Sequence, residues 1–305
     1  MRLNEVQKAG AVFLLIISCC IREVKAQQYF LPPSSHYRPD RIRKIVIAET
    51  ALFTVTSIGL YYLWYKKHPK SRFHFFNDNH EWFQIDKAGH ATTAYTIAQT
   101  QYDLLRWGGV PSNRAIGTSV LTSMAYMSII EVLDGFSKGW GFSIGDMLAN
   151  TAGAALFATQ QKMWKEQRIS LKISSRFSPY AQYNPSLLGK NGTARLLKDY
   201  NGQTYWLSLN IHSFLPPNNR FPEWANLAFG YGADGMINAS ENKGINNLKT
   251  VRYRQFYLAP DADLYRMKSN TTLNTSLYLL RFMKIPSPAL EFNSKRKFIF
   301  HPVQF

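Results

Sequence analysis

The sequence predicts an α+β protein in which an N-terminal bundle of about four helices is followed by a β-rich C-terminal region. Two observations predict this fold. Long stretches up to about residue 165 carry helix start and stop signals, whereas later stretches alternate apolar and polar side chains. We therefore expect a helical domain over residues 38–165 and a β-rich region over 166–305.

The first helical stretch is nearly continuous apolar sequence, "IVIAETALFTVTSIGLYYLWY" at residues 45–65. About 20 such residues are long enough to span a membrane. However, Glu49 and several threonines within the stretch suit a helix that is buried against other helices. Both interpretations fit the sequence.

Three further helices are expected at about 81–107, 112–133 and 143–165. The third of these opens with Ser143 and Asp146, which have the spacing of a helix capping box. It also carries Gly145, Ala149 and Gly153 at four-residue intervals. Small residues at this spacing allow two helices to approach closely. We therefore expect a tightly packed bundle.

Strands are expected where the side chains alternate, as in "TYWLSLNIHSF" at residues 204–214. A short amphipathic helix, "LNTSLYLLRFM", interrupts this region. The expected strands number four or five, and a closed transmembrane barrel needs about eight. The sequence therefore favours a sheet that packs on helices or pairs with a partner. The expected strand segments are 169–177, 204–214, 224–232, 250–267 and the C-terminal "KFIFHPVQF".

Residues 1–26 have the layout of a secretory signal, with a basic start, a short apolar core and small residues before Gln27. Cleavage after Ala26 is the preferred interpretation. A second one is a lipobox, "IISC", in which Cys19 becomes the lipidated N-terminus. Under cleavage after Ala26 the mature chain has no cysteine, and hence no disulfide, thiolate metal site or cysteine nucleophile. Either way we expect an exported protein.

The formal net charge of +17 favours a polyanionic neighbour. Because export makes nucleic acid an unsuitable partner, we expect membrane lipid or its anionic headgroups, or an envelope protein. A solvated basic surface is the plain alternative. The loop "WYKKHPKSRFHFFNDNHEWF" at residues 64–83 mixes basic and aromatic side chains, as interfacial loops do.

One constellation of polar residues carries the possible chemistry of the chain. Asp86 and His90 lie one helical turn apart in "WFQIDKAGHATTAYTIAQ", so they share a helix face next to Lys87. Antiparallel packing of consecutive helices would bring them to one end of the bundle together with acidic and amide residues of the next two helices. The full candidate set is Asp86, Lys87, His90, Glu131, Asp134, Asp146 and Asn150.

Three interpretations of this constellation remain open. A buried network that sets helix register needs only mutual hydrogen bonding, and we prefer it. An acid–base centre would use the Asp–His pair with a second carboxylate. A metal site would use His90 with Glu131, Asp134 or Asp146, although one histidine is few for zinc. We assign no cofactor and no metal.

The stretches "DKAGHATTAY" and "EVLDGFSKGWGFSIGDMLANTAGA" resemble the YfiM-like family of uncharacterised predicted periplasmic lipoproteins. More remotely, they are similar to VanZ-like membrane proteins, which share a DK-x-x-H element. The resemblance covers residues 82–161. It implies a small helical unit at a bacterial envelope membrane, favours the lipobox at Cys19, and implies no reaction.

We therefore expect an exported protein at the outer membrane or the periplasmic face of the envelope. Its expected role is structural, in assembly, or in binding lipid or a partner, without a reaction. The alternative is a membrane-bound hydrolase or transferase that acts on lipid or lipopolysaccharide headgroups through the Asp/His/Glu cluster.

Overall fold

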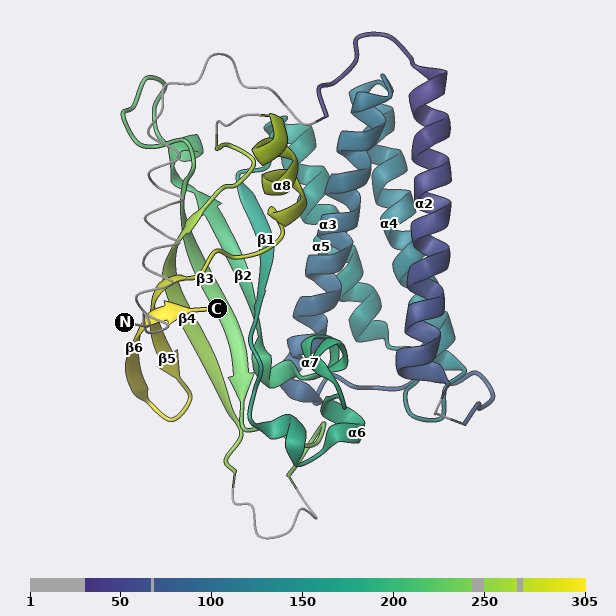
Figure 1. Cartoon of the computed structure of the whole chain (residues 1–305), viewed down its shortest axis with the longest axis vertical. Helices are drawn as coiled ribbons and strands as arrows, with labels where there is room; N and C mark the ends of the chain where they lie inside the picture. Colours follow the sequence, from purple (N-terminus) through teal and green to yellow (C-terminus); the bar gives the residue numbers. More distant parts are fainter. Residues whose placement is uncertain (1–30, 67–68, 243–249, 268–270) are drawn as a thin grey trace. The chain divides into compact units, whose positions relative to one another are not determined.

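The computed structural model describes residues 31–66, 69–242, 250–267 and 271–305 (Figure 1). The expected signal segment, with both Cys19 and Ala26, lies outside the described residues. The chain divides into two compact units. One is helical and covers Leu31–Gln167, and the other holds the β-sheet in residues Arg168–Phe305.

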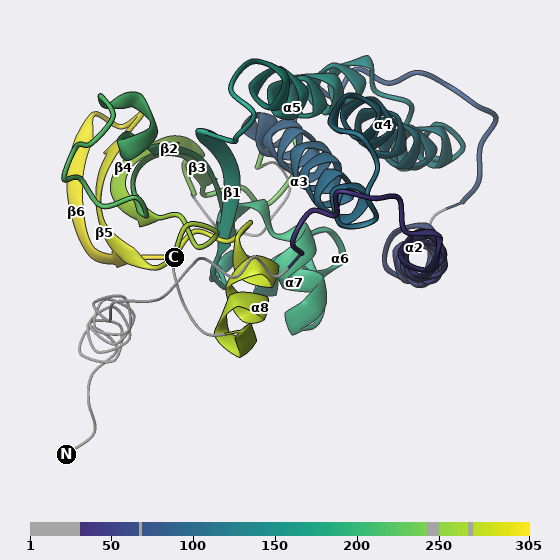
Figure 2. The ribbon, with the colours of Figure 1, turned by 90° about the horizontal axis from the view of Figure 1, so that it is seen from above.

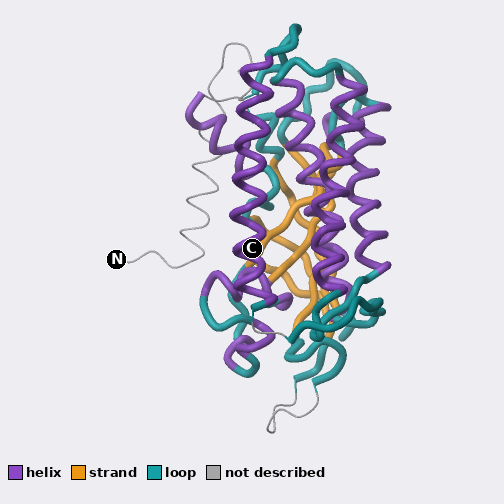
Figure 3. The backbone as a smooth tube through the Cα atoms, turned by 90° about the vertical axis from the view of Figure 1, so that its right-hand side faces the viewer, coloured by secondary structure: helices purple, strands orange, loops and turns teal. Residues whose placement is uncertain are grey.

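Four long helices form the helical unit, and they run side by side (Figure 3). They confirm the predicted helical N-terminal half. A π-helical turn, Tyr61–Tyr65, extends the first helix, and a 3₁₀ turn, Trp82–Gln84, precedes the second. The long helices are α2 (Pro39–Leu60), α3 (Ile85–Trp107), α4 (Ser112–Gly135) and α5 (Ile144–Met163).

Helix α3 packs against both α4 and α5, and small residues make these contacts close (Figure 2). Ala94 and Ala98 are fully buried, and the Ser123 hydroxyl of α4 donates a hydrogen bond to the Ala94 carbonyl at 2.7 Å. Helix α2 lies at the flank, where Phe53 meets Tyr126 of α4 edge to face. The core of this unit is therefore the α3–α4–α5 group.

Within the described part of the chain, α4 is the helix that is long and apolar enough to cross a membrane by length and composition. Core helices of soluble bundles meet the same criterion. Helix α2, which covers most of the apolar segment 45–65, does not meet it.

The second unit contains six antiparallel strands in sequence order, β1-β2-β3-β4-β5-β6. Five of them match the expected segments, and β5 was missed, so the expectation of four or five strands is corrected to six. Three short helices, α6 (Pro185–Leu188), α7 (Gly192–Lys198) and α8 (Thr271–Leu280), accompany the sheet. The strands are β1 (Ile169–Ser175), β2 (Gln203–Asn210), β3 (Ala225–Asp234), β4 (Tyr253–Ala262), β5 (Ser287–Asn293) and β6 (Lys297–Gln304).

The sheet is curved (Figure 2), and one of its faces carries large apolar side chains on every strand. The strand register aligns them in two rows, which we call the apolar face. The side chains of both rows are exposed or partly exposed. The first row is Leu171, Leu207, Phe229, Leu258, Leu290 and Phe300, and the second is Ile173, Tyr205, Tyr231, Phe256, Phe292 and Phe298.

The opposite face is buried and combines small or aromatic residues with charged groups. Trp206, Tyr257 and three alanines form its apolar cluster. Beside them the Lys172 ammonium donates to Asp261 Oδ2 at 2.7 Å, and Glu291 Oε2 lies 2.7 Å from His301 Nε2. The sheet therefore turns its bulky aliphatic side chains outward and buries charges behind them.

Candidate functional site

The turn before α3 places the first polar residues of the helical unit. Trp82, Phe83 and Gln84 all have positive φ values, between 47° and 61°. This left-handed conformation is costly for residues with side chains and persists where surrounding structure enforces it. It delays the start of α3 to Ile85, later than the expected start near residue 81, and sets Asp86 in the first helical turn.

Polar side chains from three helices then meet at one end of the helical unit. Asp86, Lys87 and His90 come from the start of α3, Glu131 from the end of α4, and Asp146 and Asn150 from the start of α5. Ser143 caps α5 by accepting a hydrogen bond from the Asp146 amide at 3.1 Å, as the sequence predicts. We call Asp78, Asp86, Lys87, His90, Glu131, Asp146 and Asn150 the polar cluster.

Lys87 compensates three carboxylates at once. Its Nζ lies 2.6 Å from Asp78, 3.0 Å from Asp86 and 2.9 Å from Asp146. Burial acts to lower the pKa of Lys87, but the charge of Asp86 and the hydrogen bonds to Asp78 and Asp146 raise it above its usual value. The ammonium therefore stays charged and takes the position that a cation would occupy among these three acids.

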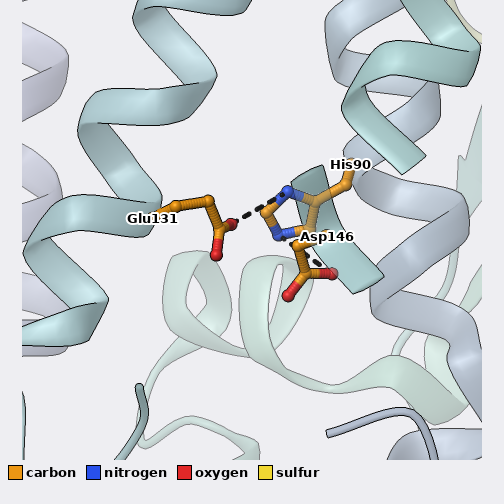
Figure 4. A group of neighbouring side chains, drawn as sticks. All are labelled: His90, Glu131 and Asp146. Carbon is orange, nitrogen blue, oxygen red and sulfur yellow. Dashed lines mark ion pairs between the residues drawn. The ribbon is translucent and has the colours of Figure 1, made fainter. Parts of the chain in front are cut away.

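His90 lies between Glu131 and Asp146 (Figure 4). Its Nδ1 lies 3.1 Å from Asn150 Oδ1 and 3.4 Å from Glu131 Oε1. On the other side of the ring, Nε2 lies 3.8 Å from Asp146 Oδ1. The side chain of His90 is 20% exposed, so solvent reaches the ring.

Glu131 is the most enclosed acid of the cluster, at 1% exposure. Its Oε2 accepts a hydrogen bond from the Ser143 amide at 3.3 Å, while Oε1 accepts none. Burial, together with the charges of Asp146 and Asp134, raises the pKa of Glu131 to about 8. Burial also raises the pKa of Asp146 to about 6, against the lowering effects of His90 and Lys87. This end of the bundle thus holds more acid than its bases neutralise.

Asp134 lies apart from the His90 contacts. Its Oδ1 accepts a hydrogen bond from the Tyr65 hydroxyl at 2.7 Å. Burial raises the pKa of Asp134 to about 7. Among the described residues, the group around His90 whose ligand atoms lie close enough to hold a metal ion is His90, Glu131 and Asp146, and Asp134 is outside it.

Reasoning from the sequence missed two residues that bind the charged groups at this end of the bundle. Asp78 lies in the loop before α3 and accepts hydrogen bonds from Lys87 and, at 2.6 Å, from the Ser143 hydroxyl. Tyr65 belongs to the segment 64–83, whose sequence resembles that of interfacial loops, and its hydroxyl donates a hydrogen bond to Asp134. No periodic spacing links these loop and helix-end residues to the cluster, so the sequence carried no signal for either.

The fold and the cluster define a helical unit with a buried, acid-rich polar centre, joined to a six-stranded antiparallel unit. Residues 74–162 match the model of a family described as "Predicted periplasmic lipoprotein (DUF2279)". Every residue of the polar cluster lies within the matched stretch. The expected resemblance to an uncharacterised periplasmic lipoprotein family is thereby confirmed for this part of the chain.

The family description is consistent with an exported protein of the cell envelope. The remoter similarity to VanZ-like membrane proteins has no support in these comparisons. No curated protein and no solved structure matches the chain.

Proposed function

We propose that this chain is an outer-membrane-associated envelope protein whose sheet binds lipid through its apolar face. The observation that carries the proposal is the unbroken row of large apolar side chains across all six strands, with charged groups buried behind it. Proteins that fold in water place such side chains inside, whereas membrane β-proteins place them outside. Lipid acyl chains are the occupant that this pattern fits.

Charge at the border of the apolar face supports the same occupant. By register, Arg254 and the β5–β6 turn lie just beyond the second row, and the turn carries Lys295 and Arg296. The second row itself is mainly aromatic. Aromatic residues prefer the depth of lipid headgroups, and basic residues bind their phosphates.

The height of the apolar face limits how deeply it inserts. Rows two residues apart are about 7 Å apart along a strand, so the two rows cover far less than the roughly 25 Å of a transmembrane apolar band. The strands are seven to ten residues long. We therefore propose contact with one leaflet rather than a crossing of the bilayer.

Flotation of the full chain with lipid vesicles tests this proposal. We expect the chain to float with vesicles that contain phosphatidylglycerol and less with vesicles of phosphatidylcholine alone. The double change Leu258→Gln and Leu290→Gln should weaken binding by about tenfold, because each leucine loses apolar contact worth at least 1 kcal/mol.

The matched control is Leu196→Gln with Leu197→Gln. These leucines belong to α7 of the same unit and are similarly exposed, at 39% and 46% against 40% and 55% for Leu258 and Leu290. The control should float like the unchanged chain. Equal loss in both double variants, with native circular dichroism, would refute the assignment of the apolar face to lipid.

A hydrolase or transferase acting on lipid headgroups is the second candidate function. One observation favours it: His90 is partly exposed and lies between two carboxylates, an arrangement suited to proton transfer. The nucleophile is the weak point. Ser143 touches the cluster, but it is 1% exposed and its hydroxyl donates to Asp78. More structural observations therefore support lipid binding than support an enzymatic role.

A further inference from the structure

On the His90 side of the polar cluster, Glu131 has no matching lysine or arginine in the described part of the chain. Among the described residues, the carboxylates of Asp78, Asp86 and Asp146 share Lys87, as set out above. Besides the Ser143 amide, Glu131 faces His90, which is charged only when protonated. A buried carboxylate without a cation or a full set of hydrogen bonds is costly, so this side of the cluster calls for a positive group.

Unsatisfied polar atoms point to where that group would lie. Glu131 is 1% exposed, and its Oε1, the atom directed at His90, accepts no hydrogen bond (Figure 4). Asn150 is fully buried, and its Nδ2 donates no hydrogen bond. Buried polar atoms are nearly always paired in folded proteins. The unpaired Glu131 oxygen beside His90 marks a place where a positive group is expected, whereas the Asn150 N–H needs an acceptor such as water.

We propose that His90, Glu131 and Asp146 bind a divalent metal ion. One ligand atom from each of the three lies within 4.8 Å of the other two, close enough for the three to share one ion after the side chains adjust. The proposal concerns the helical unit and does not depend on lipid binding by the sheet.

Asn150 gives His90 the orientation that a metal ligand needs. When Nδ1–H donates to Asn150 Oδ1 across 3.1 Å, the lone pair of Nε2 faces Asp146. A second-shell hydrogen bond of this kind fixes the tautomer of most metal-bound histidines. Two ligands about 2.1 Å from one ion lie about 3.0–3.4 Å apart. Nε2 and Asp146 Oδ1, at 3.8 Å, therefore need to approach by a few tenths of an ångström to share an ion.

The donor set indicates which ion it would hold. One imidazole nitrogen with carboxylate oxygens suits a harder ion such as Mn²⁺, whereas zinc sites usually supply more nitrogen or sulfur. The partial exposure of His90 leaves room for water to complete the coordination. Lys87 holds Asp78 and Asp86 and shares Asp146 Oδ1 with the proposed ion, so it keeps a second ion out of its half of the cluster.

Titration of the purified full chain with Mn²⁺, without lipid, tests the site. Binding is followed by calorimetry and by the loss of the free-ion signal in electron paramagnetic resonance. We expect one saturable site with a dissociation constant of about 1 mM or tighter. Glu131→Gln and His90→Gln should each weaken binding by at least about tenfold.

Asp134→Asn is the matched control. It replaces a buried acid at the same helix end by a neutral amide but leaves the three ligands in place, so Mn²⁺ affinity should change by less than about threefold. Circular dichroism checks that each variant is folded, and His90→Gln carries the test if Glu131→Gln does not fold. Absence of saturable binding, or equal weakening by Asp134→Asn, would overturn the proposal. Either result leaves the flotation test of the sheet unaffected.

Discussion

Lys87 and Asp134 are two ionisable residues at the same end of the bundle, and their surroundings favour opposite states of ionisation. Lys87 has three carboxylate partners within 3.0 Å. Asp134 accepts a hydrogen bond from the neutral Tyr65 hydroxyl and has no ion-pair partner among the described residues, and burial raises its pKa to about 7. The first residue is stabilised as an ion, and the second is stabilised as the protonated acid.

Asp134→Asn should therefore make the protein more stable at pH 8. The unfolded acid ionises near pH 4, whereas the folded one holds its proton up to about pH 7. The folded state thus binds more protons over this range, and its stability falls as the pH rises from 4 to 7. The variant removes this loss, and we expect a gain of about 2 kcal/mol in the free energy of unfolding at pH 8.

Denaturant unfolding at pH 5 and pH 8 measures this effect. The increase in the free energy of unfolding caused by Asp134→Asn should be larger at pH 8 than at pH 5. The exposed Asp40, paired with Arg38 on the surface, supplies the control change Asp40→Asn, which should have little effect at either pH. A variant at Asp134 that is less stable than the unchanged chain at pH 8 would contradict the pKa assignment.

At the scale of single residues, the sequence predicted part of the polar cluster. Helical spacing placed Asp86 with His90 and Asp146 with Asn150 on common faces, and the structure brings all four together. Lys87 was grouped with them, but its role as partner of three acids depends on Asp78, a loop residue. Loop conformation follows from the left-handed turn at residues 82–84, which no local rule predicts for Trp, Phe and Gln.

Among the elements, α3 and α5 form the closest helix pair, and Gly153 permits it. A methyl group added at Gly153 would collide with the backbone carbonyl oxygen of Ala91. Backbone atoms cannot move aside as a flexible side chain can. The contact therefore requires glycine at this position, as the spacing of Gly145, Ala149 and Gly153 indicated.

Gly153→Ala should lower the free energy of unfolding by about 1–3 kcal/mol, because α3 and α5 must separate to admit the methyl group. Thermal unfolding followed by circular dichroism measures the change. Gly117→Ala in α4 is the matched control, since an added Cβ there meets no atom within 4 Å. That change should stabilise the helix by about 0.5–1 kcal/mol. Equal effects of the two changes would contradict the close contact.

Prediction of the elements succeeded where periodicity was strong and failed where it was not. The four long helices and the alternating strands β2 and β3 were expected from period and capping. Strand β5, "SPALEFN", was missed because proline and glutamate disguise its alternation. In the structure Glu291 points to the buried face, where His301 and Asn293 satisfy it. A buried acid in a strand cannot be recognised from the sequence pattern when its partners are not known.

For the whole molecule, the open question of the N-terminus has a direct test. The family description of residues 74–162 favours lipidation, so we expect a mature chain that begins at lipidated Cys19 and is recovered with envelope membranes. Mass spectrometry of the mature N-terminus and labelling with palmitate check this. A mature chain that begins at Gln27 would contradict it and restore cleavage after Ala26. Recovery in the cytoplasm would refute export altogether.

The outward apolar side chains of the sheet also have a consequence for how the protein reaches its destination. A chain secreted across the inner membrane would traverse the aqueous periplasm with Phe229, Leu290 and Phe298 uncovered. Uncovered strands of this kind associate with one another in water. Delivery would therefore need an escort that shields the sheet in transit, and overproduction beyond the capacity of that escort should yield insoluble aggregates rather than surplus soluble protein.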